Sequence, residues 1–395
     1  MLHVRATASL LIILSAQINA LSLDEIIDKA LIQNPSLESI THRISANSSD
    51  IDISNQFANP TLTYAQNTIN ANEPMSQKTL TLQQKIPFYG KRDALKNISV
   101  AQEKILHVKL LEAKINLVNA IKNQAYSIWE LKELLKIIEN YIDFTKQKLE
   151  LSQSYTSTTD NQHMGIMSAE LTLSDLKIKT SELKAKIITA YAKLSYLASF
   201  EIEDLDLSLH VSNLQDIATL EKSLANNSSL HVKESEIEKS ETLYKSADLD
   251  NYPDINLIAG YAYRENFDNF FNLGVGINLP IYGSEDYKQE KARQMSLVAK
   301  SLKQDTKIVI NSEFKTAYAQ MKSAYEIYHI IQDEALPQIA HMFELSDASI
   351  STGGDLFKYI DILTQKLKLE QKSVAAVALY NRSNAKLTAL SGELQ

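Results

Sequence analysis

Side chains that could carry chemistry are few and scattered in this sequence of 395 residues. Cysteine is absent, which excludes disulfides, thiolate metal sites, cysteine nucleophiles and a lipid-modified N-terminal cysteine. Ser, His and Asp occur without a nucleophile-elbow or metal-hydrolase motif. His163, Met164 and Met167 offer soft ligands to copper, but methionines at helical spacing more often serve packing. We therefore expect no enzymatic activity, no cofactor and no metal site.

A basic pair, Lys91 and Arg92, follows Gly90. The run is not a phosphate-binding loop, because the Gly-x-x-x-x-Gly-Lys-Ser/Thr spacing is absent. At the inner edge of a membrane such a pair would meet lipid phosphates, whereas on an ordinary surface it would be solvated. The whole chain has 40 Lys and Arg against 48 Asp and Glu, a formal charge of -8, so nucleic acid is not an expected partner.

Long helices surround these residues. The chain holds only 9 Gly and 7 Pro, and neither occurs from Asp93 to about Ser154, which predicts a helix of about 60 residues and about 90 Å. Pro337 is expected to kink a later helix, since it lacks the N–H that continues the ladder. Apolar steps of three and four predict coiled-coil packing at 128–142 and 314–328 and at Leu173, Leu176, Thr180, Leu183, Ile187, Ala190, Leu194 and Leu197.

Two pairs of strands interrupt the helices, near 60–69 and 78–87 and near 253–264 and 270–280. Large apolar residues alternate there with small or polar ones. Such runs of about ten residues with aromatic ends are typical of transmembrane β-strands, although a soluble sheet with one face on a core gives the same pattern. Four strands cannot close a barrel, so a membrane location requires an oligomer, most simply a trimer with twelve strands. The segments 70–74 and 265–269 are then the outer loops.

The two halves of the chain repeat each other at an offset of 193 residues. Asn-Pro-Ser-Leu at 34–37 reappears as Asn-Ser-Ser-Leu at 227–230, and Ile-Pro-Phe-Tyr-Gly at 86–90 reappears as Leu-Pro-Ile-Tyr-Gly at 279–283. We therefore predict a duplicated unit of helices, two strands and a long helical hairpin. The first copy spans 21–205 with its hairpin at 90–200, and the second spans 206–395 with its hairpin at 284–392.

The N-terminus has the layout of a secretory signal at residues 1–20. His3 and Arg5 precede an apolar run that ends in Ile-Asn-Ala at 18–20. The run is too short to span a bilayer as a stable helix, and an uncleaved anchor is the alternative. Cleavage after Ala20 removes Arg5 and leaves 39 basic against 48 acidic residues, a formal charge of -9 on the exported chain.

Together these features resemble the TolC family of outer-membrane efflux proteins. The likeness is carried by the duplicated Asn-Pro-x-Leu helix end, the strand pairs, the run Gln-Gln-Lys-Ile-Pro-Phe-Tyr-Gly-Lys-Arg at 83–92, and a final stretch with Gly353-Gly354, Asp361-Ile362-Leu363 and Leu390-Ser391-Gly392. The resemblance implies a mainly α fold with transmembrane β-structure. Long coiled-coil hairpins would form an α-barrel, and four strands per chain would complete a twelve-stranded β-barrel as a homotrimer.

The resemblance also implies a passive exit duct of a tripartite efflux system, in the outer membrane of a Gram-negative bacterium and extending into the periplasm. Its partners would be outer-membrane lipid, a periplasmic adaptor protein and an inner-membrane pump. The Gly-Lys-Arg at 90–92 is similar to the CzcC and CusC branch that serves heavy-metal cation pumps, which favours cations as substrate. A multidrug or type I secretion conduit of the same fold is an alternative, and a soluble periplasmic coiled-coil adaptor is a second one.

In this family the duct narrows where the hairpins turn, here near 156–161 and 352–355. Asp361 matches the family's Asp-Val-Leu pattern at an acidic ring, whereas the next acidic position of that pattern is Thr364 here. Three Asp361 carboxylates on one axis would repel one another and attract cations. A surface position on a helix is the alternative. Asp355 and Asp160, at the turns, are the other candidates for this periplasmic gate.

Overall fold

The computed structural model describes residues 21–67, 76–154, 160–350 and 354–394. The predicted signal at 1–20, the first outer loop and parts of both hairpin turns therefore lie outside the described residues. The chain divides into two compact units, each of which takes segments from both halves of the sequence. We call them the hairpin unit (up to Asn34, 120–213 and 321–382) and the sheet unit (35–119, 214–320 and 383–395).

The sheet unit holds a four-stranded antiparallel sheet. Its order is β2 (Thr61–Gln66), β3 (Gln77–Ile86), β5 (Ile255–Arg264) and β6 (Phe270–Ile277). The central pairing, β3 with β5, joins the two halves of the sequence and sets Ile86 opposite Ile255. Alternating side chains fix this register, because a slip of one residue would exchange the two faces.

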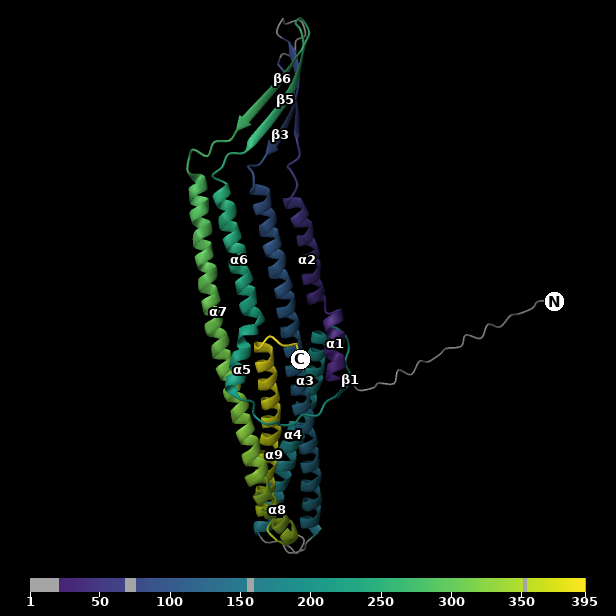
Figure 1. Ribbon diagram of the computed structural model, residues 1–395. Coiled ribbons are helices and arrows are strands. Elements are labelled where there is room, and N and C mark those ends of the chain that lie inside the picture. The colour runs from purple at the N-terminus through teal and green to yellow at the C-terminus, as the bar shows by residue number, and fades with distance from the viewer. Residues whose placement is uncertain (1–20, 68–75, 155–159, 351–353, 395) are drawn as a thin grey trace, which may run out of the picture. The chain divides into compact units, whose positions relative to one another are not determined.

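A short segment joins each strand of this sheet to a helix. Figure 1 shows α2 (Pro35–Ser54), the start of α3 (Lys91–Ser154), α6 (Ser228–Leu249) and α7 (Ser284–His329) side by side. The short α5 (Ile217–Ser223) and the 3-10 turn η1 (Leu224–Asn226) precede α6. With 64 residues, α3 confirms the predicted long helix, since neither Gly nor Pro interrupts its backbone ladder.

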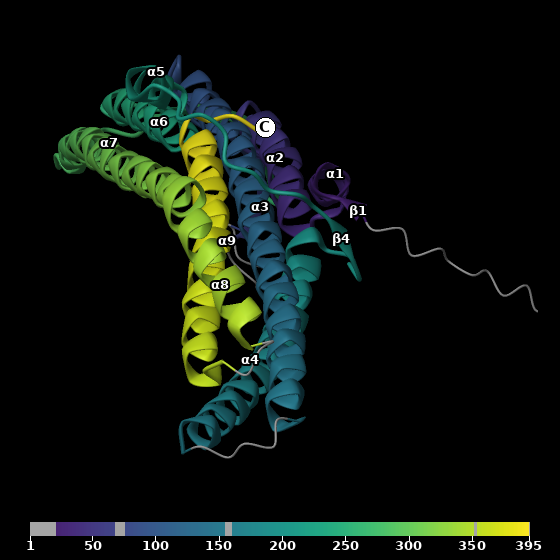
Figure 2. The ribbon, with the colours of Figure 1, turned by 90° about the horizontal axis from the view of Figure 1, so that it is seen from below.

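The hairpin unit is a bundle of long helices (Figure 2). It contains the remainder of α3, α4 (Asp160–Ala198), the π-helical segment η2 (Ile330–Ala335), α8 (Leu336–Ile350) and most of α9 (Leu356–Leu390). The predicted stripe on α4 faces the core, where Leu176 and Leu194 are at most 1% exposed. Among the described residues, no helix combines the length and the apolar character needed to cross a bilayer.

Pro337 interrupts its helix as the sequence predicts, and the interruption takes a π-helical form. The residues directly before α8 form the π-helical segment Ile330–Ala335, and Pro337 is the second residue of α8. Because Pro337 has no N–H, a carbonyl of the preceding turn loses its partner, and a π turn is a common way to absorb such a break.

A short parallel pair holds the beginning of the described chain. β1 (Leu21–Ser22) pairs with β4 (Leu205–Asp206), and Figure 2 shows both beside α1 (Leu23–Gln33). Ser22 and Glu25 form a capping box at the start of α1. The helix ends at Gln33, and the extended backbone of its C-cap Asn34 precedes Pro35 as predicted.

One tertiary contact occurs in both halves at the offset found in the sequence. The side-chain amide of Asn34 donates to the carbonyl of Leu197 at 3.1 Å. The side-chain amide of Asn227 donates to the carbonyl of Leu390 at 2.9 Å. Both partners are displaced by the same 193 positions. A contact repeated in this way supports the proposal that the chain arose by duplication.

Candidate functional site

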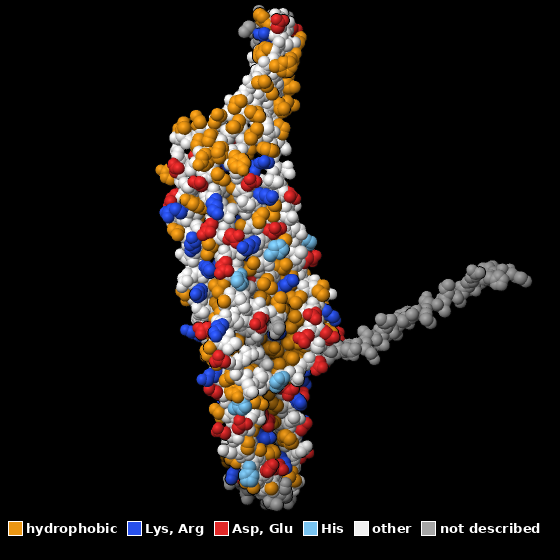
Figure 3. All heavy atoms as spheres, in the orientation of Figure 1, with side chains coloured by type: hydrophobic (Ala, Val, Ile, Leu, Met, Phe, Trp, Pro, Cys, Tyr) orange, Lys and Arg blue, Asp and Glu red, His pale blue; other side chains and the backbone are white. Residues whose placement is uncertain are grey.

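One face of the sheet is lined by large apolar side chains that the described chain leaves uncovered. Leu273 is 88% exposed and Phe271 is 81% exposed. Cross-strand pairs such as Leu257 with Val275 keep these side chains on one face. Figure 3 shows apolar side chains gathered over the strands, in contrast to the charged side chains over the helices of the same unit. The other exposed members are Leu62, Tyr64, Leu80, Leu82, Ile255, Tyr261, Tyr263 and Ile277.

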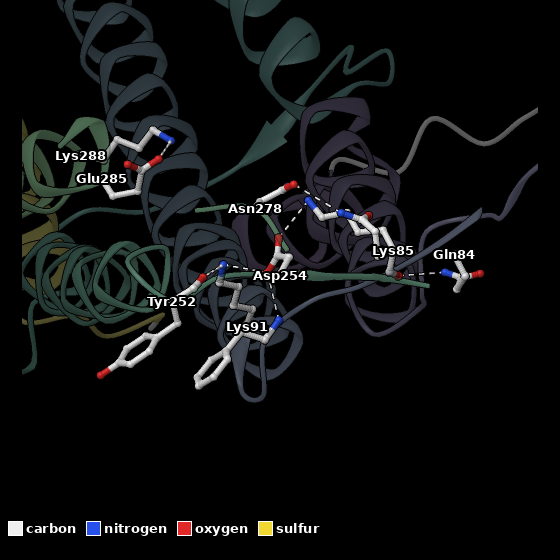
Figure 4. A network of polar contacts seen from close by, with 10 residues as sticks. Gln84, Lys85, Lys91, Tyr252, Asp254, Asn278, Glu285 and Lys288 are labelled. Atoms are coloured by element: carbon white, nitrogen blue, oxygen red, sulfur yellow. Dashed lines mark hydrogen bonds and ion pairs between the residues drawn. The ribbon is translucent and has the colours of Figure 1, made fainter. Parts of the chain in front are cut away.

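A polar network ties the two halves together where strands meet helices (Figure 4). Asp254, directly before β5, accepts a hydrogen bond from Lys91 Nζ at 2.8 Å and pairs with Lys85 Nζ at 3.0 Å. It also accepts the backbone N–H of Phe88 at 3.0 Å. Burial alone would raise the pKa of the Asp254 carboxyl, but these donors outweigh burial and lower the pKa to about 2. The carboxylate therefore stays ionised at neutral pH.

The predicted membrane-edge basic pair is engaged by the chain itself. The Lys91 side chain is 13% exposed, and its ammonium group also donates to the carbonyl of Tyr252 at 2.7 Å. The guanidinium of Arg92 lies 3.8 Å from the centroid of the Phe57 ring and donates to the carbonyl of Asn55 at 3.1 Å. Contact of either cation with lipid phosphates stays a prediction.

No motif in the sequence points to Asp254, the residue that organises this network. The repeat gives no signal for it, because the matching position of the first copy is Thr61. Lys91 has Ser284 as its counterpart, so the ion pair has no equivalent at the other junction. A single acidic residue after a proline matches no known motif. Asp254 reaches Lys91 only because β3 and β5 pair.

The three acidic candidates for a gate have different surroundings. Asp361 on α9 is exposed and accepts a hydrogen bond from Gln365 Nε2 at 2.9 Å. Asp355 caps α9 by accepting two backbone N–H groups of its first turn, at 2.9 and 3.3 Å. Asp160 is the first residue of α4, and its side chain lies outside the described residues. An acidic ring on a symmetry axis stays a prediction.

A cluster of ion pairs and aromatic rings joins three helices in the hairpin unit. Lys148 on α3 pairs with Asp347 on α8 at 2.7 Å. Lys148 Nζ also lies 6.0 Å from the centroid of the Tyr359 ring on α9, and the Phe343 ring is 5.5 Å from that of Tyr359. Burial raises the pKa of the Tyr359 hydroxyl above its ordinary value, and Asp347 adds to the rise. The heptad pattern gave no sign of this polar cluster.

The methionines considered as soft ligands lie on the surface of α4. Met164 is 60% exposed and Met167 is 58% exposed. Within the described part of the chain, no group of three or more His, Asp or Glu side chains is placed to hold a metal ion.

Comparison with known proteins identifies the fold. No family model matches the sequence, and neither does any curated protein. The solved outer membrane protein VceC of Vibrio cholerae aligns with a TM-score of 0.78 at 14% identity, over 94% of this chain and 97% of its own. The open MtrE outer membrane channel of Neisseria gonorrhoeae aligns with a TM-score of 0.80 at 14% identity, over 94% of this chain and 89% of its own. CusC aligns with a TM-score of 0.75 at 13% identity, over 94% of this chain and 92% of its own. The chain has the fold of these outer-membrane channels.

The outer-membrane channel fold confirms the fold class expected from the sequence, with long helical hairpins and a four-stranded sheet. It also agrees with the resemblance to the TolC family. CusC, VceC and MtrE have similar TM-scores and identities. Likeness of fold therefore does not separate the heavy-metal branch from the other branches.

Proposed function

We propose that this chain is the exit duct of a tripartite efflux system, placed in the outer membrane of a Gram-negative bacterium and reaching into the periplasm. The uncovered apolar face of the sheet carries the proposal. Side chains such as Phe271 and Leu273, more than 80% exposed on adjacent positions of one face, are suited to hydrocarbon. A soluble periplasmic adaptor would leave this face in water without a reason.

The same sheet supports a homotrimer. In the described chain β2 and β6 are the outer strands, each paired with one neighbour. Open strand edges are not tolerated in hydrocarbon, so strands of other copies must close the sheet. Three chains of four strands give twelve, which is enough to enclose a lumen.

Among the substrates of such a duct, we favour heavy-metal cations. The formal charge of -9 on the exported chain and the Gly-Lys-Arg run at 90–92 support it. Hydrophobic drugs and secreted polypeptides are the alternatives for a duct of this fold. A periplasmic adaptor and an inner-membrane pump would supply substrate and energy, and Asp361 would form the acidic ring of the periplasmic gate, with Asp355 and Asp160 near it.

The proposed duct is tested with purified protein in planar bilayers. We expect a detergent-requiring trimer that fractionates with the outer membrane and gives stepwise ionic currents. Release from membranes by carbonate, or a protein that stays soluble without detergent, would contradict the proposal. Substrate is tested separately, with a deletion strain challenged with copper, zinc, cobalt and a panel of dyes and antibiotics. Hypersensitivity confined to hydrophobic drugs would overturn the preference for cations.

A further inference from the structure

A groove in the hairpin unit combines an apolar floor with a cationic rim. Leu134 and Ile138 of α3, Leu183 of α4 and Ala375 of α9 form the floor of a cavity of about 430 Å³. In a chain with a formal charge of -8, the rim is an unusual local excess of cations. It carries four lysines and one acidic residue, namely Lys179, Lys186, Lys368, Lys372 and Glu182.

Three of the rim lysines form no ion pair with the described residues. Lys179 pairs with Asp175 at 2.7 Å. No described acidic side chain lies within ion-pair distance of Lys186, Lys368 or Lys372, all three of which border the groove. Lysine stems can lie along apolar surface while their ammonium groups stay in water. The groove therefore offers hydrocarbon contact at its floor and unneutralised cations at its mouth.

The size of the groove favours a small ligand over a protein helix. Its walls cover residues 179–186 of α4 and 368–375 of α9. Eight residues of helix span only about 10 Å at 1.5 Å per residue. That length suits an alkyl chain of about ten carbons, and the volume falls in the range of small-molecule sites. A docked helix would extend well beyond both walls.

The groove stays accessible if α4 packs against another copy of the chain. Besides its buried stripe, α4 has an outer stripe of exposed apolar residues that follows a second heptad register. Lys179 follows Ile178 of this stripe directly and is therefore about 100° around the helix from it. Packing along the outer stripe therefore leaves Lys179, and Lys186 seven positions on, outside the contact. The stripe consists of Met164, Met167, Leu171, Ile178 and Ile188.

We propose that this groove binds an anionic amphiphile, a molecule with one carboxylate and an alkyl chain of about ten carbons. The alkyl chain of the ligand would lie on Leu134, Ile138 and Leu183. Its carboxylate would lie among Lys186, Lys368 and Lys372. Hydrocarbon burial supplies affinity and the lysines select the sign of the charge. The site does not depend on the proposed duct function.

Lysine acetylation tests the site in full-length protein held in lipid nanodiscs, with decanoate as the probe and mass spectrometry as the readout. We expect decanoate to protect Lys186, Lys368 and Lys372 in a saturable way. Lys193, which is exposed on α4 outside the groove, should keep its reactivity. The double variant Lys186→Glu/Lys372→Glu should shift the protection midpoint of Lys368 by about tenfold. The matched variant Lys193→Glu should leave it unchanged.

Three outcomes would overturn the inference. Equal protection by decanol, which has an alkyl chain of the same length but no charge, would show that the groove does not select an anion. Protection of Lys193 to the same extent would indicate adsorption without a site. Protection by an acidic amphipathic peptide, with none by decanoate, would assign the groove to a protein partner. Because the substituted lysines are exposed, the variants should keep the helical circular dichroism spectrum of the parent.

Discussion

Asp254 links the two halves of the chain through a single carboxylate. Its partners Lys85, Phe88 and Lys91 come from the end of β3, the following turn and the start of α3, while Asp254 itself directly precedes β5. The side chains of Asp254 and Lys91 are each 13% exposed. Loss of one partner therefore leaves a poorly hydrated charge behind.

The first prediction is that Asp254→Asn destabilises the protein. A pKa lowered from 3.8 to about 2 corresponds to roughly 2–3 kcal/mol of unfolding free energy, measured by urea unfolding in detergent. The matched control is Glu238→Gln. Glu238 of α6 pairs with Lys104 of α3, the helix that also carries Lys91, but both side chains are more than half exposed. We therefore expect Glu238→Gln to lower the unfolding free energy by less than about 1 kcal/mol. Equal losses in the two variants would contradict the role of the network.

The second prediction concerns pH. The folded-state pKa of Asp254 lies below its ordinary value of 3.8, so its stabilising contribution is complete above that value and is lost as pH falls toward 2. The difference in melting temperature between the parent and Asp254→Asn should stay constant from pH 7 to pH 5 and shrink below about pH 4. A difference that already shrinks between pH 7 and pH 5 would point to another group.

The third prediction concerns Asp361. Its exposed carboxylate accepts a hydrogen bond only from the neighbouring Gln365 among the contacts of the described chain, so it is free to face a lumen. If three copies form a ring, Asp361→Asn removes three negative charges and should lower the preference of single-channel currents for cations over anions. Lys193→Gln, at an exposed position of α4, is the control for a change of charge elsewhere on the surface. Unchanged selectivity in Asp361→Asn would remove Asp361 from the gate.

Helices and strands follow the sequence closely where periodicity encodes them. The helix expected from Asp93 to about Ser154 runs over Lys91–Ser154, and the second strand pair, expected at 253–264 and 270–280, runs over Ile255–Arg264 and Phe270–Ile277. β1 and β4 have two residues each, too few to leave a pattern. The Asp254 network and the Lys148 cluster join distant segments through side chains, which no local pattern encodes.

The fourth prediction concerns the ends of two helices at matching positions of the repeat. Ser199 and Gly392 both have positive φ, 65° and 80°. A Cβ on Gly392 would collide with the carbonyl oxygen of Asn226. Gly392→Ser should therefore lower the free energy of unfolding, measured by thermal denaturation, by more than about 1 kcal/mol. Ser199→Gly removes a strained conformation and should be neutral or stabilising by up to about 1 kcal/mol. Equal effects of the same sign would contradict this reading of the helix ends.

At the scale of the whole molecule, a single chain leaves several surfaces without a partner. The apolar face of the sheet, the outer strands β2 and β6, and the outer stripe of α4 all lie uncovered in the described chain. Lipid can cover the first of these surfaces, and further copies of the chain can cover the other two. A copy that pairs through different surfaces on its two sides forms a ring when the rotation closes.

The last prediction is that α4 of one copy packs against η2 and α8 of the next. The chain has no cysteine, so engineered disulfides report this contact without background. Ile178→Cys combined in turn with Ile330→Cys, Met342→Cys or Leu345→Cys, residues that are 46–61% exposed, should give covalent dimers and trimers and nothing larger. Each single variant should stay monomeric, because in a ring of unlike contacts a position does not meet its own copy. Lys179→Cys, about 100° around α4 from Ile178 and on the side away from Ile188, is the matched control and should not cross-link. Bands beyond the trimer would indicate an open assembly, and the absence of bands in every combination would remove α4 from the interface.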